Sequence, residues 1–267
     1  MYKILFIVFC AILGSAFGSF ACCQAWRIRL KEEKRKDPGK RSVCLSCGVR
    51  LRWFENIPIL SWILLKGKCR KCGARIGKAE ILAEMLGALA FGLFAWKFSA
   101  DANEAGVMEF IGSLDLAKLV TVFAATIGML IVAVYDGKWG EMPVSMLIYA
   151  IVMGAIFAIL GLVRGEVEVW SLVASVALLA GTYYLLYFLS KEKLVGGGDY
   201  LLCLAIGLIL ADWRLALVEL FLANFLGSLV MLPKKRRKMA FGPFLVLAFV
   251  IIFAFEKQLL STLAMNL

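Results

Sequence analysis

Long hydrophobic segments alternate with polar connections along the 267 residues. Runs of roughly 17 to 25 apolar residues are long enough to cross a bilayer as helices. The predicted spans are residues 3–26, 81–98, 116–135, 143–163, 169–190, 198–211, 215–232 and 241–260. The pattern therefore predicts an all-α polytopic membrane protein with about eight transmembrane helices.

Positive charge is concentrated in three of the connections. The segment from Arg27 to Lys78 holds 16 of the 30 Lys and Arg, Lys191–Lys193 holds two, and Lys234–Lys238 holds five. If the spans alternate in direction, these three connections fall on one side, which the positive-inside rule assigns to the cytoplasm. We therefore expect both chain termini outside and the basic connections inside.

Composition supports a membrane protein, because 62% of the residues are hydrophobic and only 18% are charged. The net charge of +11 is mostly juxtamembrane, where anionic lipid headgroups attract Lys and Arg. Membrane lipid is therefore a predicted partner and nucleic acid is not. The first 26 residues resemble a signal peptide, but their apolar run is long and leads straight into a basic loop, which favours an uncleaved span.

Four regions follow from this pattern. Residues 1–26 form the first span, and residues 27–80 form a cytoplasmic cysteine-containing loop domain. Residues 81–115 contain the second span with an external connection, and residues 116–267 form a core of six helices.

The chain contains no histidine. Hydrolases that use an imidazole base, and zinc hydrolases with histidine ligands, are therefore excluded, which leaves carboxylates as acid and base groups. Asp199 follows a glycine run between two apolar segments, and Asp136 ends the run 116–135. Acids at the mouths of membrane spans indicate function, so the two aspartates predict a shared site.

The short span after Asp199 indicates how deep this acid lies. From Asp199 to Asp212 a helix rises about 20 Å, against a hydrocarbon thickness of about 30 Å. The glycine run beside Asp199 needs protein or water to satisfy its backbone, so we expect a water-filled cavity open to the cytoplasm. The alternative is that Asp199 only caps the following helix.

Two CxxC pairs lie in the basic loop, Cys44 with Cys47 and Cys69 with Cys72, separated by 21 residues. This spacing predicts a four-thiolate structural zinc site, with an iron centre or a dithiol redox pair as alternatives. A glycine follows each pair and can adopt positive φ, turning backbone amides toward the sulfurs. The other cysteines, in apolar runs, are interpreted as packing residues.

A short apolar segment, residues 57–65, lies between the two cysteine pairs. It is too short to cross a bilayer. Packing under the cysteine loop is the preferred interpretation. The alternative is that the segment lies on the inner leaflet, with Trp53 and Trp62 at the interface.

Several ordered motifs together resemble the type IV prepilin peptidases, membrane aspartic proteases usually fused to an N-methyltransferase. Besides the two CxxC pairs, the residues that carry the resemblance are Gly18-Ser19-Phe20, Glu55-Asn56-Ile57-Pro58-Ile59-Leu60-Ser61-Trp62, Lys66-Gly67-Lys68-Cys69, Glu84, Asp136 with Pro143, Gly196-Gly197-Gly198-Asp199 and Phe241-Gly242-Pro243-Phe244. The chain departs from many relatives at Cys22, Glu80-Ile81 and Leu201, where they carry asparagine, Tyr-Pro and lysine.

The resemblance implies that Asp136 and Asp199 are a catalytic pair that removes the short basic leader of a pilin-like precursor at the cytoplasmic face of the bacterial inner membrane. It also implies methyl transfer from S-adenosylmethionine to the new amino terminus. A Rossmann-type glycine motif for this donor is not visible in the sequence.

Proximity of the two carboxylates predicts the mechanism. They cannot both ionise easily, so the pair holds one proton near neutral pH. One aspartate would then activate water while the other polarises the scissile carbonyl. The competing interpretations are a presenilin-like GxGD protease, an ion-coupled transporter and a non-catalytic scaffold.

Overall fold

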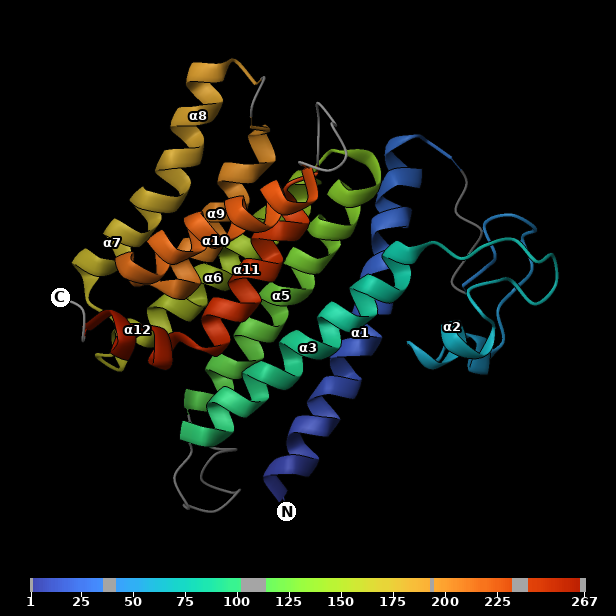
Figure 1. The fold of residues 1–267 in the computed structure, drawn as a ribbon, viewed down its shortest axis with the longest axis horizontal. Helices are drawn as coiled ribbons and strands as arrows, with labels where there is room; N and C mark the ends of the chain where they lie inside the picture. The colour runs from blue at the N-terminus through green and yellow to red at the C-terminus, as the bar shows by residue number, and fades with distance from the viewer. Residues whose placement is uncertain (1, 36–41, 102–113, 193–194, 232–239, 265–267) are drawn as a thin grey trace. The chain divides into compact units, whose positions relative to one another are not determined.

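The structure, a computed structural model, describes residues 2–35, 42–101, 114–192, 195–231 and 240–264 (Figure 1). Within these ranges every regular element is helical, and the only β-type pairings are two isolated bridges. The predicted all-α class is therefore confirmed. The chain divides into two units, Met1–Gly92 and Leu93–Leu267.

In the first unit, helix α1 (Tyr2–Glu32) packs closely against the first part of α3 (Lys78–Asp101). A Cβ atom built on Gly14 would lie 2.2 Å from the carbonyl oxygen of Gly87, and one on Gly18 would lie 2.3 Å from that of Ala83. Small residues four apart let the backbones of membrane helices touch. This contact joins the two helices that flank the cysteine loop.

The loop between these helices contains two short helical turns, η1 (Trp53–Asn56) and α2 (Leu60–Leu64). The backbone N–H of Ile59, at the start of α2, donates a hydrogen bond to Oε2 of Glu84 at 2.7 Å. Glu84 is buried on α3, so the loop is attached to the side of a membrane helix.

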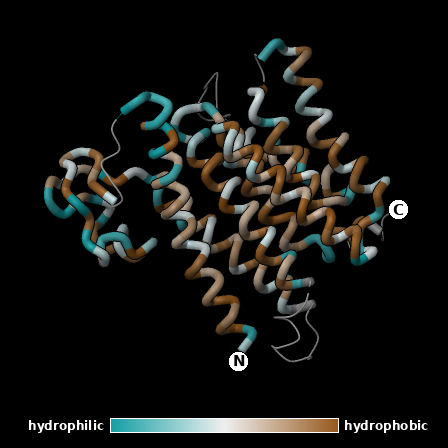
Figure 2. The backbone as a smooth tube through the Cα atoms, turned by 180° about the vertical axis from the view of Figure 1, so that it is seen from behind, coloured by the Kyte–Doolittle hydropathy of each residue, from teal (hydrophilic) through white to brown (hydrophobic). Residues whose placement is uncertain are grey.

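The second unit begins with the end of α3 and contains the remaining helices. These are α5 (Leu114–Trp139), α6 (Val144–Val163), α7 (Val169–Val176), the π-helical turn η2 (Ala177–Gly181), α8 (Thr182–Ser190), α9 (Gly197–Leu210), α10 (Trp213–Met231), α11 (Gly242–Ala254) and α12 (Glu256–Ala264). Helix α6 packs between α5 and α9, and α11 packs on α5 and α10. Figure 2 shows that these helices are mainly hydrophobic, whereas much of the cysteine loop is hydrophilic.

Each of the eight predicted segments contains helix, but the described residues do not give eight full spans. Six helices are long and apolar enough to cross a membrane, and a seventh span results if α11 and α12 are counted together. The expected single span 241–260 is wrong in detail, because the chain bends by 76° between α11 and α12. Glu256, the first residue of α12, pairs with Lys97 of α3 at 2.7 Å. Helix α9 has only 14 residues, as its short apolar run predicts.

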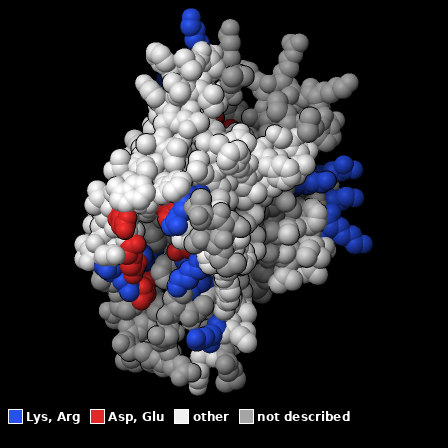
Figure 3. Space-filling model, turned by 60° about the vertical axis from the view of Figure 1, so that its left-hand side comes forward, with Lys and Arg blue, Asp and Glu red and all other residues white. Residues whose placement is uncertain are grey.

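Ion pairs join the start of α5 to the connection after α6. Arg164 pairs with Asp115 and Lys118 pairs with Glu166, which places these two chain segments at the same end of the unit. Figure 3 shows acidic and basic side chains intermixed in one patch. Of the basic residues on which the topology prediction rests, Lys193 and the run 234–238 lie outside the described residues.

Candidate functional site

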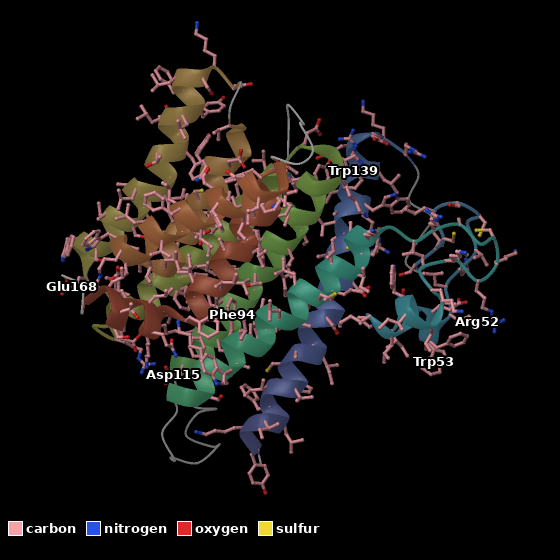
Figure 4. The ribbon with its side chains drawn as sticks, in the orientation of Figure 1. Arg52, Trp53, Phe94, Asp115, Trp139 and Glu168 are labelled. Carbon is pink, nitrogen blue, oxygen red and sulfur yellow. The ribbon has the colours of Figure 1, made fainter. Side chains whose placement is uncertain are left out.

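Asp136 lies in the last turn of α5, three residues before Trp139. Figure 4 labels Asp115 and Trp139, which mark the two ends of this helix. Oδ2 of Asp136 accepts a hydrogen bond of 2.8 Å from the backbone N–H of Gly242, and the N–H of Phe241 also interacts with the carboxyl group. The first N–H groups of a helix have no partner within it. Asp136 therefore supplies an acceptor to the start of α11 from a different helix.

The sequence around Gly242 explains how α11 approaches so closely. A Cβ atom at Gly242 would lie 3.0 Å from Oδ2 of Asp136 and 3.0 Å from Cε of Met142. Pro243 follows at the helix start, where its missing N–H costs no hydrogen bond. The residues of the segment Phe241–Phe244 therefore allow the N-terminus of α11 to contact Asp136.

Asp199 lies in the first turn of α9 and is buried like Asp136. Its Oδ2 accepts a hydrogen bond of 2.9 Å from the backbone N–H of Gly196, so the residue does cap its own helix. Its Oδ1, however, is buried without a hydrogen-bond partner in the structure. The capping interpretation therefore accounts for only one of the two oxygens.

The two aspartates lie close enough for the charge of Asp199 to act on Asp136. Met142 lies between the segments that carry them. A Cβ atom at Gly198 would meet the Met142 side chain at 2.6 to 2.8 Å, and one at Gly242 would meet its terminal methyl group. The sequence analysis did not identify Met142, and its place next to Pro143 was the only available signal.

The four cysteines of the loop form one cluster. Their sulfur atoms all lie within 4.8 Å of one another, and the Cys44 and Cys72 sulfurs are 3.8 Å apart. Four thiolates around a tetrahedral metal with bonds of about 2.3 Å would be separated by about 3.8 Å. The cluster therefore fits a metal ion held by four sulfurs.

The two CxxC segments fold in the same way, although they are 21 residues apart. In each, the glycine after the second cysteine donates its N–H to the carbonyl oxygen of the first, from Gly48 to Cys44 and from Gly73 to Cys69. An isolated bridge closes each turn, between residues 43 and 50 and between residues 68 and 75. Both glycines have positive φ, at 67° and 71°, as predicted.

The environment of the cluster favours a thiolate at Cys44, whereas at Cys72 the hydrogen bond from Ala74 is outweighed by burial and the other cysteines, which raise the pKa to about 11. Burial alone would raise the pKa of Cys44, but hydrogen bonds from the backbone amides of Cys47 and Ser46 outweigh it and lower the pKa to about 7. A thiol must lose its proton to bind a metal. The turn therefore prepares Cys44 for that role.

One further acid, Glu219 on α10, was missed by the sequence analysis. Its side chain is fully buried, and neither of its oxygens has a hydrogen-bond partner in the structure. Glu219 interacts electrostatically with Cys203 of α9 and Tyr183 of α8, and both of these also interact with Asp199. The available signal was a glutamate inside the apolar run 215–232.

These features define a class: polytopic helical membrane proteins with a buried aspartate pair and a four-cysteine loop after the first helix. Two family models match the chain, the bacterial peptidase A24 N-terminal domain over residues 12–98 and the type IV leader peptidase family over residues 123–232. The first range contains the four cysteines and the second contains both aspartates.

Curated relatives agree with these models. The chain is 31% identical to the prepilin leader peptidase/N-methyltransferase of Neisseria gonorrhoeae, over 79% of this chain and 70% of the relative. It is 24% identical to the protein of the same name from Pseudomonas aeruginosa, over 98% of this chain and 94% of the relative. No solved structure matches significantly. The chain belongs to the type IV leader peptidase family.

Proposed function

We propose that the protein removes the leader from type IV prepilin-like precursors and N-methylates the new amino terminus. The family membership supports both activities, because the matched relatives carry both in their name. The observation that supports the peptidase site is the buried aspartate pair, in which each carboxylate is oriented through its Oδ2 and Asp199 keeps Oδ1 unpartnered.

The arrangement suits acid–base hydrolysis of an amide. The N–H groups of Gly242 and Gly196 fix the orientation of the two side chains through Oδ2, and Oδ1 of Asp199 keeps no protein partner that a substrate carbonyl or water would have to displace. Because adjacent carboxylates share one proton, the ionised aspartate takes a proton from the attacking water while the protonated aspartate donates its proton to the carbonyl oxygen. When the tetrahedral intermediate breaks down, the first aspartate gives its proton to the leaving amine and the second takes back a proton from the hydroxyl group of the intermediate, which restores the pair. The proton belongs to the pair, so neither aspartate is assigned a fixed role.

The cysteine cluster is proposed to hold zinc through Cys44, Cys47, Cys69 and Cys72. A site with four thiolates has no open position, so the metal would stabilise the loop rather than activate water. The described residues do not define a cradle for S-adenosylmethionine, and no peptidase step involves this methyl donor.

The domain organisation and the orientation are also proposals. We assign residues 1–26 to the first span, 27–80 to the zinc loop, 81–115 to the second span with its external connection and 116–267 to the peptidase core. The basic connections support a bacterial inner-membrane protein whose aspartates face the cytoplasm. A presenilin-like protease or an ion-coupled transporter is not favoured, because the family models cover both the cysteine loop and the helical core.

Co-expression with a pilin-like precursor tests the peptidase activity by gel mobility. The variants Asp136→Ala, Asp136→Asn, Asp199→Ala and Asp199→Asn should leave the precursor uncleaved. Asp212→Asn is the matched control, because this aspartate lies at the other end of α9 and pairs with Arg214. Parental processing by any folded variant at positions 136 or 199 would contradict the proposal. Mass spectrometry of the mature pilin terminus tests methylation, and an unmodified amine would count against it.

A further inference from the structure

The elements η1 and α2 contact each other and carry an exposed apolar patch, which consists of Trp53 in η1 and Leu60, Ile63 and Leu64 in α2. These side chains are 80%, 57%, 57% and 77% exposed, respectively. Figure 4 shows Trp53 at the margin of the loop, next to Arg52. Exposed apolar residues gathered in one place mark an interaction site more often than a chance arrangement.

The spacing of the three α2 residues places them together on one exposed face of the helix. Leu60, Ile63 and Leu64 stand at positions i, i+3 and i+4, which lie on one face of a helix. Trp62, between them, points the other way and packs on the loop. A Cβ atom built on Gly67 would lie only 2.9 Å from the Trp62 ring. The preferred expectation, that the apolar segment packs under the cysteine loop, is therefore wrong for these three residues.

A hydrogen bond fixes the depth of the patch along a membrane helix. The N–H of Ile59, directly before α2, binds Glu84, which lies six residues after Lys78 at the start of α3. Six helical residues rise about 9 Å. The headgroup region of a leaflet is roughly 5 to 8 Å thick. With Lys78 at the surface where headgroups meet water, α2 begins near the boundary between headgroups and hydrocarbon. With five residues, α2 cannot cross the bilayer.

Exposed basic residues flank the patch on both sides. Arg52 precedes Trp53, and Lys66 lies two residues after the end of α2. Anionic headgroups attract such residues, and tryptophan prefers the interface between headgroups and hydrocarbon. Apolar side chains at this depth with basic neighbours match the chemistry of an amphipathic segment in the membrane plane.

We propose that Trp53, Leu60, Ile63 and Leu64 insert into the interface of an anionic phospholipid bilayer and hold the cysteine loop flat against the membrane beside α3. The occupant of this surface is lipid, not a second copy of the chain and not a precursor protein. The inference does not depend on the peptidase activity.

Photo-crosslinking tests the inference in the full chain. Benzoylphenylalanine is placed at Leu64 and, as the matched control, at Leu45, which is a 63% exposed leucine on the first CxxC turn. The protein is reconstituted in vesicles of phosphatidylethanolamine and phosphatidylglycerol, illuminated and examined by mass spectrometry. We expect lipid adducts at position 64 to exceed those at position 45 by at least about fivefold, and Arg52→Gln with Lys66→Gln to reduce them about twofold or more.

Two results would overturn the inference. One is an equal yield of lipid adducts at positions 64 and 45. The other is a predominant adduct at position 64 with a protein, either a second copy or a co-reconstituted pilin precursor. Metal content measured on both labelled proteins verifies that the loop is folded. Cleavage of a precursor, measured separately, tests the peptidase and leaves this result unaffected.

Discussion

The cysteine cluster and the aspartate pair are built in opposite ways. Each half of the cysteine cluster is a local turn whose cysteines, glycine and backbone hydrogen bonds lie within a few residues of one another. The aspartate pair depends on segments far apart, since Asp136 of α5 is held by Gly242 of α11, 106 residues further on. A metal site made of local turns can be assembled and lost by itself, whereas the acid pair requires the whole helical core.

The first prediction concerns the local site. Cys72→Ser should abolish metal binding, reducing the metal content from about one per chain to near zero, because a structural zinc site contributes on the order of 10 kcal/mol to local folding. Limited proteolysis should then cut within residues 42–77. Cys23→Ser on α1 is the control and should keep its metal. Full metal content in Cys72→Ser would show that the cluster is not the ligand set.

The second prediction separates orientation from chemistry at the acid pair. Asparagine at position 136 or 199 keeps a carbonyl oxygen for the N–H of Gly242 or Gly196, so the melting temperature should change little. The proton is lost, and cleavage should fall by about 10² to 10⁴-fold, the usual contribution of a general acid or base. Single-turnover cleavage and thermal unfolding of the same preparations give both quantities. A large loss of stability in either variant would indicate that the aspartate acts mainly in the fold.

The third prediction concerns Glu219. A buried polar group without a partner destabilises a protein by about 1 to 3 kcal/mol. Replacing it with methionine, a side chain of similar length, should therefore raise the stability by about that amount in a detergent unfolding experiment. Glu219→Gln keeps the polar group and is the control, with little expected change. A destabilised methionine variant would mean that Glu219 has a polar partner in the working protein.

The fourth prediction is the smallest and concerns the contact between the distant segments. Gly242→Ala places a Cβ atom 3.0 Å from Oδ2 of Asp136, so the Asp136 carboxyl group or the start of α11 must shift by a few tenths of an ångström. Cleavage should then fall about tenfold, equivalent to about 1.4 kcal/mol. Gly181→Ala is the matched control, because a Cβ atom there meets nothing within 4 Å and alanine favours helix. Kinetics with the two variants measure the difference. Equal rates would show that the approach of α11 to Asp136 does not matter for catalysis.

The contrast between the sites also explains what could be predicted from the sequence. The four cysteines and the positive φ of Gly48 and Gly73 follow from spacing alone, since all the determinants are local. The eight hydrophobic segments and the two acids at their ends were equally visible. The catalytic role of the acids and the identity of the metal stay predictions.

What escaped the sequence depends on contacts between segments that are distant along the chain. Met142 looks like an ordinary residue of a connection, yet it lies against both Gly198 and Gly242. Glu219 is inconspicuous until packing shows that no donor reaches it. After the bend that follows α11, Glu256 of α12 pairs with Lys97 of α3. Hydrophobic periodicity contains no information about such partners.

The backbone contact between Gly14 and Gly87 sets the chain entropy of the cysteine loop. Residues 33–77 leave α1 and return to α3, and the touching helices hold the two ends of this segment at a fixed separation. The contact between α1 and α3 therefore offsets the entropic cost of closing the loop, and it does so without the metal. An ion entering the cluster orders a chain whose ends are already joined, which favours tight binding even though the sulfurs lie near the surface.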